Sequence, residues 1–304
     1  MTYNEFIDLM VDRLGEVYPD STIEKVVANK NNGVVFRGVN IRGVEENCSP
    51  NIYLENIFEK YEEDNDFEYA LNYVKNAYES AKISGLTSME YYIDYNQVCD
   101  NILFKLINKE YNEELLKDVP YIDYLDLAIV FYYKFPEGFN NISTASILIR
   151  NQHMHRWGVG TNDLFKAAME NTPRVLGFSV KGILDTVCDM VSDENVPNEL
   201  MEKKSDLEPV LVATNNHMYY GAAVILYKDA LKTLATKING DLYVIPSSIH
   251  EVIMFDSNSV NEEFIEHIRG MISLINETQV KREDVLSNNL YLYSKDENSL
   301  KIVS

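Results

Sequence analysis

The run Leu125–Phe135 constrains the fold most, because an extended chain with this sequence is apolar on both of its faces. One face would carry Leu125, Leu127, Ile129, Phe131 and Tyr133, and the other Ala128, Val130 and Tyr132. Such a strand has to be covered on both sides, as a central strand of a sheet is. We expect Ile142–Ile149 to pair with it across a turn at residues 136–138.

The first third of the chain combines helices with a β-hairpin. Thr2 and Glu5 form the S/T-x-x-E capping box that begins a helix, and Pro19 ends it. Ile23–Ala28 and Val34–Ile41 read as strands joined at an Asn-Gly turn. Residues 53–83 predict two helices, the second of them capped by Asp66.

Helices and strands also alternate in the rest of the chain. Residues 151–172 predict two helices broken near Gly158 and Gly160, and Val180–Met190 predicts a third. The strands expected towards the C-terminus are Val210–Ala213, Asp241–Ile245, Glu251–Phe255 and a closing hairpin of Leu290–Ser294 with Leu300–Val303. The predicted fold class is therefore α+β, with mostly antiparallel or mixed sheets flanked by amphipathic helices.

In the last third of the chain, the sequence predicts the end of one helix and the start and the apolar face of another. The helix around Ala230–Ile238 should end at Asn239-Gly240, with Gly240 in the left-handed conformation. Ser259 and Glu262 form a second capping box. The helix that follows carries a strong apolar stripe, made of Phe264, Ile265, Ile268, Met271, Ile272 and Ile275.

A chain of 304 residues is long for one domain and comfortable for two. We predict an N-terminal helical region with a β-hairpin over residues 1–120 and an α+β region over residues 121–304, with packing as one unit as the alternative. Residues 192–209 are polar and contain two prolines, which is typical of a linker or a long loop.

The formal net charge of −21 argues against direct binding to nucleic acid or to an anionic membrane, since both need a basic surface. It favours a protein as the partner. The acidity is greatest over residues 55–79, with eight acids and two bases, on helices whose apolar stripe is intact. The three cysteines are far apart and the N-terminus lacks the pattern of a signal peptide, so we expect a cytoplasmic protein.

The segment Pro246–Glu251 is the most suggestive of catalysis, because it offers a hydroxyl, an imidazole and a carboxylate at the junction of two predicted strands. The candidate residues are Ser247, Ser248 and His250, with His217 from a polar loop at another strand end. Neighbouring residues of an extended chain point to opposite faces, so a polar turn is the competing interpretation. A hydrolase with a serine nucleophile is the enzyme hypothesis that these residues raise.

His153 and His155 are the weak candidates for a metal site. Residues two apart diverge on a helix, which is the structure expected here, and no H-E-x-x-H motif is present. We predict neither a metal nor a cofactor, since no phosphate-binding loop or dinucleotide motif occurs either.

Several longer segments together resemble a known group of proteins. They are SPNIYL (49–54), residues 108–131, ENTP (170–173), residues 221–255 and residues 276–293. They resemble an uncharacterised domain-of-unknown-function family of gut Clostridia and, distantly, the YtpQ-type proteins of bacilli. The resemblance covers nearly the whole chain and implies a bacterial cytosolic α+β protein, with no chemistry assigned to any residue.

Three functions follow as hypotheses. We favour a non-enzymatic interaction or regulatory protein over an enzyme, because no catalytic motif occurs and the chain is acidic and rich in tyrosine. The second hypothesis is the hydrolase-like enzyme using the Ser247/His250 region with His217. The third is an acidic mimic of nucleic acid that blocks a DNA-binding or defence protein.

Overall fold

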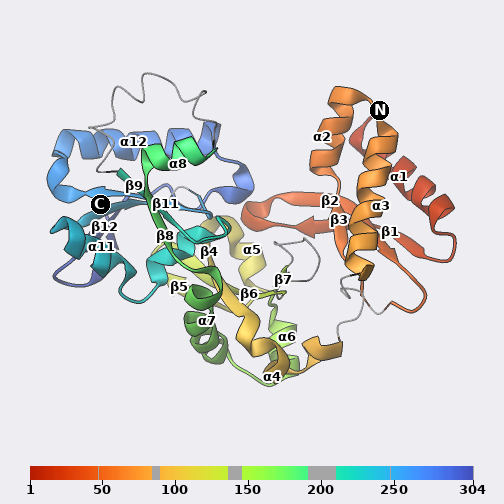
Figure 1. Cartoon of the computed structure of the whole chain (residues 1–304), viewed down its shortest axis with the longest axis horizontal. Coiled ribbons are helices and arrows are strands. Elements are labelled where there is room, and N and C mark those ends of the chain that lie inside the picture. Colours follow the sequence, from red (N-terminus) through yellow and green to blue (C-terminus); the bar gives the residue numbers. More distant parts are fainter. Residues whose placement is uncertain (47, 84–89, 136–145, 191–209, 247, 304) are drawn as a thin grey trace. The chain divides into compact units, whose positions relative to one another are not determined.

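The structure is a computed structural model that describes residues 1–46, 48–83, 90–135, 146–190, 210–246 and 248–303. Its helices and three antiparallel sheets, counted over those residues, make a mixed α+β fold, as the sequence predicted (Figure 1). Internal contacts divide the chain into two compact units. The first comprises Met1–Val98 with Lys134–Ser146, and the second Cys99–Tyr133 with Ile147–Ser304.

This division falls after Val98, whereas the boundary predicted from the sequence is at residue 120. The strand Ile102–Asn108 belongs to the second unit because it pairs along its whole length with the central strand at Leu127–Lys134. The predicted linker at 192–209 and the turn at 136–138 lie outside the described residues.

The first unit packs three main helices against a three-stranded sheet of order β1-β2-β3. Its elements are α1 (Tyr3–Val17), β1 (Thr22–Asn29), β2 (Val35–Arg42), β3 (Asn51–Tyr53), α2 (Glu55–Asp64), α3 (Phe67–Ile83) and the short α4 (Tyr95–Val98). Thr2 and Glu5 form the predicted capping box of α1. The predicted hairpin is also confirmed, with Asn32 and Gly33 both at positive φ in its turn.

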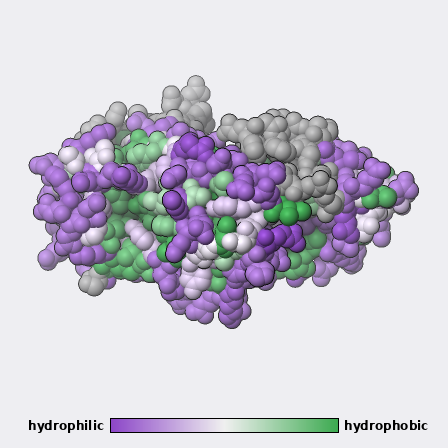
Figure 2. Space-filling model, turned by 90° about the horizontal axis from the view of Figure 1, so that it is seen from below, coloured by the Kyte–Doolittle hydropathy of each residue, from purple (hydrophilic) through white to green (hydrophobic). Residues whose placement is uncertain are grey.

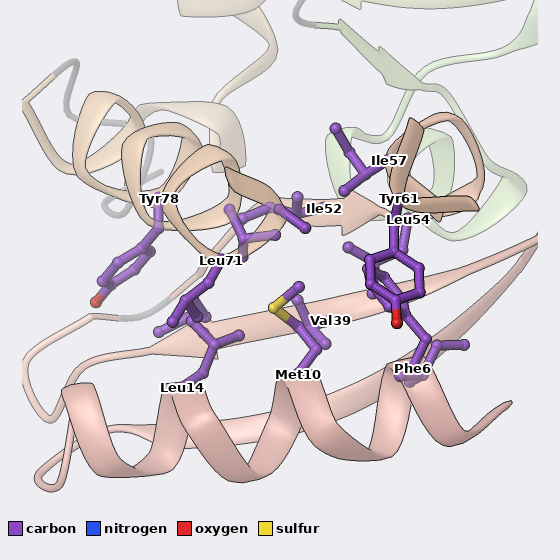
Figure 3. Packing of buried hydrophobic residues seen from close by; sticks show 14 residues of the cluster. Phe6, Met10, Leu14, Val39, Ile52, Leu54, Ile57, Tyr61, Leu71 and Tyr78 are labelled. Atoms are coloured by element: carbon purple, nitrogen blue, oxygen red, sulfur yellow. The ribbon is translucent and has the colours of Figure 1, made fainter. Parts of the chain in front are cut away.

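One hydrophobic cluster fills the first unit. Figure 3 shows Phe6, Met10 and Leu14 projecting from α1 toward β2 and α3, where they meet Val39 and Leu71. These α1 residues recur at intervals of four, so they lie on one face of the helix. The acidic side chains of α2 and α3 are mostly exposed on the opposite faces, which is the arrangement expected of a solvated surface.

The second unit contains the two other sheets. Its elements up to the gap at residues 191–209 are β4 (Ile102–Asn108), α5 (Glu113–Leu116), β5 (Tyr121–Tyr124), β6 (Leu127–Lys134), β7 (Ser146–Leu148), α6 (Asn151–Trp157), α7 (Thr161–Leu176), β8 (Ser179–Gly182) and α8 (Ile183–Met190). After the gap come β9 (Val210–Thr214), α11 (Ala230–Ile238), β10 (Leu242–Ile245), β11 (Val252–Asp256), α12 (Glu262–Thr278), β12 (Tyr291–Ser294) and β13 (Ser299–Ile302).

β6 is the central strand that the sequence predicted. All of its residues are buried, and it pairs with β4 and β5 on its two sides, while β7 also pairs with it. The other sheet has six strands in the order β13-β12-β10-β11-β9-β8. α12 packs against it through Ile265 and Ile272.

Three local predictions in this unit are wrong. The helix predicted over Val180–Met190 begins only at Ile183, because residues 179–182 pair with β9 as strand β8. α11 ends with Asn239, and not Gly240, in the left-handed conformation. α12 is capped by the Asn261 side chain, which accepts a hydrogen bond from the Phe264 N–H, whereas the Ser259 hydroxyl donates to the carbonyl of Asp256.

The surface is largely hydrophilic on the face shown in Figure 2, with hydrophobic residues in separate patches. Among the helices in the described ranges, none has both the length and the apolar character that crossing a bilayer demands.

Candidate functional site

The turn between β9 and the 3₁₀ helix Gly221–Leu226 is held in an unusual conformation. The Asn215 side chain donates to the carbonyl of Tyr219 and accepts from the backbone N–H of His217. Met218 and Tyr220 both adopt positive φ, at 52° and 55°. A side chain with a Cβ is strained in this region, and such strain concentrates at functional sites. The turn is therefore the first place to look for function.

Gly221 lets this turn lie directly against the β10–β11 connection. A Cβ at this position would meet the Thr214 hydroxyl at 1.9 Å and the carbonyl oxygen of His250 at 2.3 Å. The same two groups bond to each other, since the Thr214 hydroxyl donates to the His250 carbonyl over 2.7 Å. Only glycine permits this approach, which brings His250 beside the two tyrosines of the turn.

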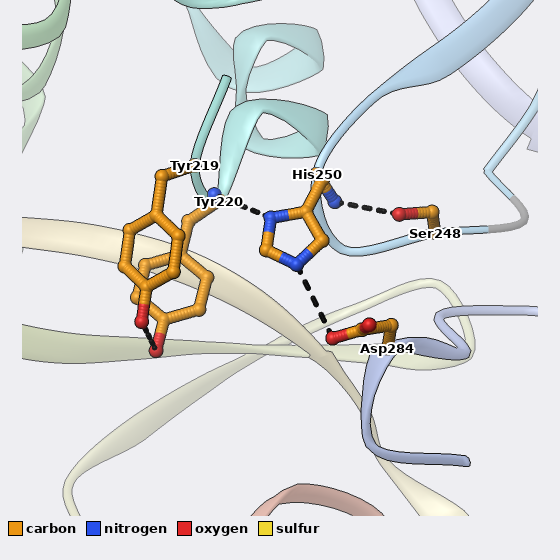
Figure 4. A network of polar contacts seen from close by, with 5 residues as sticks. All are labelled: Tyr219, Tyr220, Ser248, His250 and Asp284. Carbon is orange, nitrogen blue, oxygen red and sulfur yellow. Dashed lines mark hydrogen bonds and ion pairs between the residues drawn. The ribbon is translucent and has the colours of Figure 1, made fainter. Parts of the chain in front are cut away.

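The His250 imidazole uses both of its nitrogens within the protein (Figure 4). Its Nδ1 accepts a hydrogen bond of 3.3 Å from the backbone N–H of Tyr220. In the neutral ring the hydrogen is therefore on Nε2, which donates to Oδ1 of Asp284 over 3.2 Å. The ring also lies parallel to that of Tyr220, with centroids 6.1 Å apart. His250 thus ties the turn to the segment around Asp284.

Ser248 is buried, and its hydroxyl accepts a hydrogen bond of 2.9 Å from the backbone N–H of His250. Figure 4 shows it on the backbone side of His250, away from the imidazole. With both ring nitrogens engaged elsewhere, this geometry does not pair a serine hydroxyl with the histidine as a base. His217 is exposed in the turn described above. Ser247 lies outside the described residues, so the hydrolase hypothesis stays a prediction.

The tyrosines of the turn form a compact aromatic group with Tyr132 of β6. The rings of Tyr219 and Tyr220 have centroids 3.9 Å apart, and the Tyr219 hydroxyl donates to that of Tyr220 over 2.8 Å. Tyr132 meets the Tyr220 ring edge-on at 5.4 Å. Burial raises the pKa of all three phenols, so they stay protonated at neutral pH and keep their O–H donors.

Lys105 brings a positive charge into this group. Its ammonium nitrogen lies 3.9 Å from the centre of the Tyr220 ring, which is a cation–π contact. Burial among protein atoms lowers the pKa of Lys105 to about 8, and the nearby Tyr219 counteracts this only in part. The residue as a whole is half-buried. A lysine shifted in this way marks a candidate functional site.

The weak metal candidates lie elsewhere, on α6. His153 Nδ1 accepts a hydrogen bond of 3.2 Å from the backbone N–H of Arg150, so it closes the first turn of this helix. Burial and the charges of Arg150 and Arg156 lower the pKa of His153. His155 is exposed. In the parts of the chain that the structure describes, no three His, Cys, Asp or Glu side chains are grouped as metal ligands.

The second candidate surface is on α12, and we call it the α12 apolar face. The predicted stripe is only partly buried: Ile265, Ile268 and Ile272 pack against the sheet, whereas four apolar side chains of the helix stay exposed, Phe264 among them despite its edge-on contact with Phe255. They are Phe264 (44% exposed), Met271 (37%), Leu274 (59%) and Ile275 (39%). Phe264, Met271 and Ile275 are spaced seven and four residues apart, so they lie on one line along the helix.

The sequence marked His217 in this loop as a candidate, but it did not mark Lys105, Asp284 or the two tyrosines of the turn as site residues. Lys105 left a signal, since it is the single charged residue in the apolar strand Ile102–Asn108. Asp284 left none, because its carboxylate reaches His250 from 34 residues away in the sequence.

Comparison with known proteins gives a family and no activity. No curated protein and no solved structure matches the chain. The family of unknown function DUF5688 matches residues 3–295, which is nearly the whole chain. The chain therefore belongs to the DUF5688 family of unknown function.

Proposed function

We propose that this is a non-enzymatic regulatory protein that acts by binding a partner protein through the α12 apolar face. The observation that carries the proposal is the line of Phe264, Met271 and Ile275, with Leu274 beside it, exposed on a helix that packs against the sheet through Ile265 and Ile272. Exposed apolar groups of this kind mark interaction surfaces. Burying each of these side chains against a partner contributes on the order of 1 kcal/mol.

The charge around this face indicates the chemistry of the partner. α12 carries four glutamates and one arginine, and that arginine, Arg269, is already paired with Glu266. The rim of the face is therefore acidic. A second copy of this chain also has a net charge of −21 and would be repelled. We therefore commit to a basic amphipathic segment, with an apolar stripe for the centre and Lys or Arg for the rim.

The test uses the full chain and two labelled helical peptides with the same leucine stripe, one with lysines and the other with glutamates on its polar face. Fluorescence anisotropy should show tighter binding of the lysine peptide. The double variant Met271→Glu/Leu274→Glu should weaken that binding by about tenfold or more, since it removes roughly 1.4 kcal/mol or more of contact.

The matched control is Val27→Glu/Val44→Glu, which adds the same two charges at exposed valines of the first unit. It should bind the lysine peptide as the wild-type protein does. Equal loss in both double variants, or equal binding of the two peptides by the wild-type protein, would refute the proposal.

We include the cellular location and the origin of the protein in the same proposal. The net charge, the cysteine pattern and the resemblance of the sequence support the cytoplasm of a bacterium, and the resemblance supports an origin in gut Clostridia and a distant relationship to YtpQ-type proteins. The acidic nucleic-acid mimic remains a second candidate, which the exposed acids of α2 and α3 favour.

A further inference from the structure

We propose that Lys105 and Tyr220 form a binding site for the carboxylate group of a small organic acid. The site is in the second unit, away from the α12 apolar face, and it goes beyond the proposed function by giving the protein a small-molecule ligand. The proposal rests on two hydrogen-bond donors that lie together and have no acceptor among the residues that the structure describes, and on the access that solvent has to them.

The first donor is the ammonium group of Lys105. Its side chain stands on one face of the sheet between two buried apolar clusters, with Leu103 on one side and Ile107 on the other. Within the described residues, its one direct partner is the face of the Tyr220 ring, and no carboxylate forms an ion pair with it. A desolvated cation without a counter-ion is costly, and an anion that reaches it is correspondingly well bound.

The second donor is a phenol hydroxyl. Tyr219 and Tyr220 have two hydroxyl hydrogens between them, and their mutual hydrogen bond uses one. The Tyr219 hydroxyl donates to Tyr220, which leaves the hydrogen of Tyr220 without an acceptor in the described part of the chain. This hydroxyl is on the same ring that Lys105 covers, so both donors can reach the two oxygens of one carboxylate.

The surroundings favour a single negative charge over a double one. The site offers one cation and one neutral donor. The carboxylate of Asp284, which is bonded to His250, acts on both Tyr219 and Tyr220 electrostatically and would repel a dianion such as phosphate. Lys105, Tyr219 and Tyr220 each retain partial exposure, so a small acid can enter from solvent.

The donor on Tyr220 is held in place before any ligand binds. Tyr220 is fixed at positive φ, its N–H is bonded to His250, and its ring is packed against Tyr132. Holding the donors in place before the ligand arrives reduces the entropic cost of binding.

The pH dependence of anion binding is set by Lys105 and the titratable groups around it. These groups are Tyr132 of β6, Tyr219 and Tyr220 of the turn, and the His250–Asp284 pair behind them. The ammonium form binds the anion, and burial lowers the pKa of Lys105 to about 8. Binding should therefore be nearly full at pH 7 and about 30-fold weaker at pH 9.5, from the fraction of lysine that stays charged.

The experiment is a calorimetric titration of the full chain with sodium acetate, sodium benzoate and inorganic phosphate at pH 7 and pH 9.5. The variants are Lys105→Met and Tyr220→Phe. The matched control is Lys109→Met, which also removes one lysine charge, here from a surface ion pair with Asp123. We expect binding of a carboxylate in preference to phosphate, a loss of about tenfold or more in Lys105→Met, a smaller loss in Tyr220→Phe, and no change in Lys109→Met.

Three results would overturn the proposal: no carboxylate binding by the folded wild-type protein at millimolar concentration, unchanged binding by Lys105→Met, or an equal loss in Lys109→Met. Circular dichroism of each variant shows that it is folded, and Tyr220→Phe supplies an independent test if Lys105→Met is not. Binding of the lysine peptide to α12 should be the same in all these variants, so the failure of this site and of the proposed function are distinguishable.

Discussion

The ammonium nitrogen of Lys105 and the ring of Tyr220 are 3.9 Å apart, although 115 positions separate the two residues in the sequence. The pair joins a buried strand to a strained turn, and the His250–Asp284 hydrogen bond holds that turn from its other side.

Replacing Lys105 with methionine should stabilise the protein at neutral pH. The pKa of this lysine is lowered from its usual value of 10.5 to about 8 in the folded state, so the unfolded chain binds its proton more tightly. The penalty is complete below pH 8 and disappears as the pH rises from 8 to above 10.5. Urea unfolding should show a gain of up to about 3 kcal/mol at pH 7 that shrinks toward pH 10. A variant that is less stable than wild type at pH 7 would contradict the assigned desolvation.

Gly221→Ala should destabilise the second unit. The new Cβ would overlap the Thr214 hydroxyl and the His250 carbonyl, so the turn has to move, at a cost of about 1–3 kcal/mol. Gly15→Ala is the control, because it lies within α1 with open space around it and should gain about 0.5–1 kcal/mol. Thermal unfolding of both variants checks the contrast, and a neutral Gly221→Ala would show that the turn is looser than described.

Met218→Gly should be more stable than Met218→Ala. The Met218 side chain is exposed, so little packing is lost, but its φ of 52° strains any residue that has a Cβ by about 1–2 kcal/mol. Glycine relieves this strain, and its greater freedom in the unfolded chain offsets part of the gain. A net advantage of up to about 1 kcal/mol over alanine is expected in denaturant titrations. The reverse order would mean that residue 218 is not held in the left-handed conformation.

Asp126→Ala should cost much more than Asp123→Ala. The Asp126 carboxylate accepts hydrogen bonds from Ser287, Asn289 and the hydroxyl of Tyr291, whereas Asp123 forms a largely exposed ion pair with Lys109. Removing the shared acceptor leaves buried donors unpaired, at about 2–4 kcal/mol, while the exposed pair is worth less than about 1 kcal/mol. Chemical denaturation of the two variants tests this difference, and similar losses would argue against the central role of Asp126.

Local chemistry made much of the fold predictable from the sequence. The capping box of Thr2 and Glu5, the Asn32-Gly33 turn and the two-faced strand at β6 each depend on neighbouring residues, and each is confirmed. The helix predicted over Val180–Met190 starts late because its first residues pair with the distant strand β9, and the other two wrong predictions arose where two local solutions compete. Asn261 and Ser259 are both good helix caps, and Asn239 and Gly240 both tolerate positive φ.

The candidate site was less predictable, because its contacts are long-range. The sequence pointed to His250 and to His217 in a polar loop, but the serines beside His250 suggested a partner for its imidazole that the geometry does not provide. The groups that contact it come from Tyr220 and Asp284, and the charge comes from Lys105. In the same way, periodicity identified the apolar stripe of α12 but could not say which of its residues the sheet covers.

Site-specific photo-crosslinking in the host cell tests the central claim most directly. A photoreactive amino acid at position 271, on the α12 apolar face, should give a discrete crosslinked protein, and the same group at position 44 should not. Mass spectrometry should locate the crosslink in a basic amphipathic segment of that protein. A product common to both positions, a crosslink to a second copy of this chain, or no product at position 271 would contradict partner binding through this face.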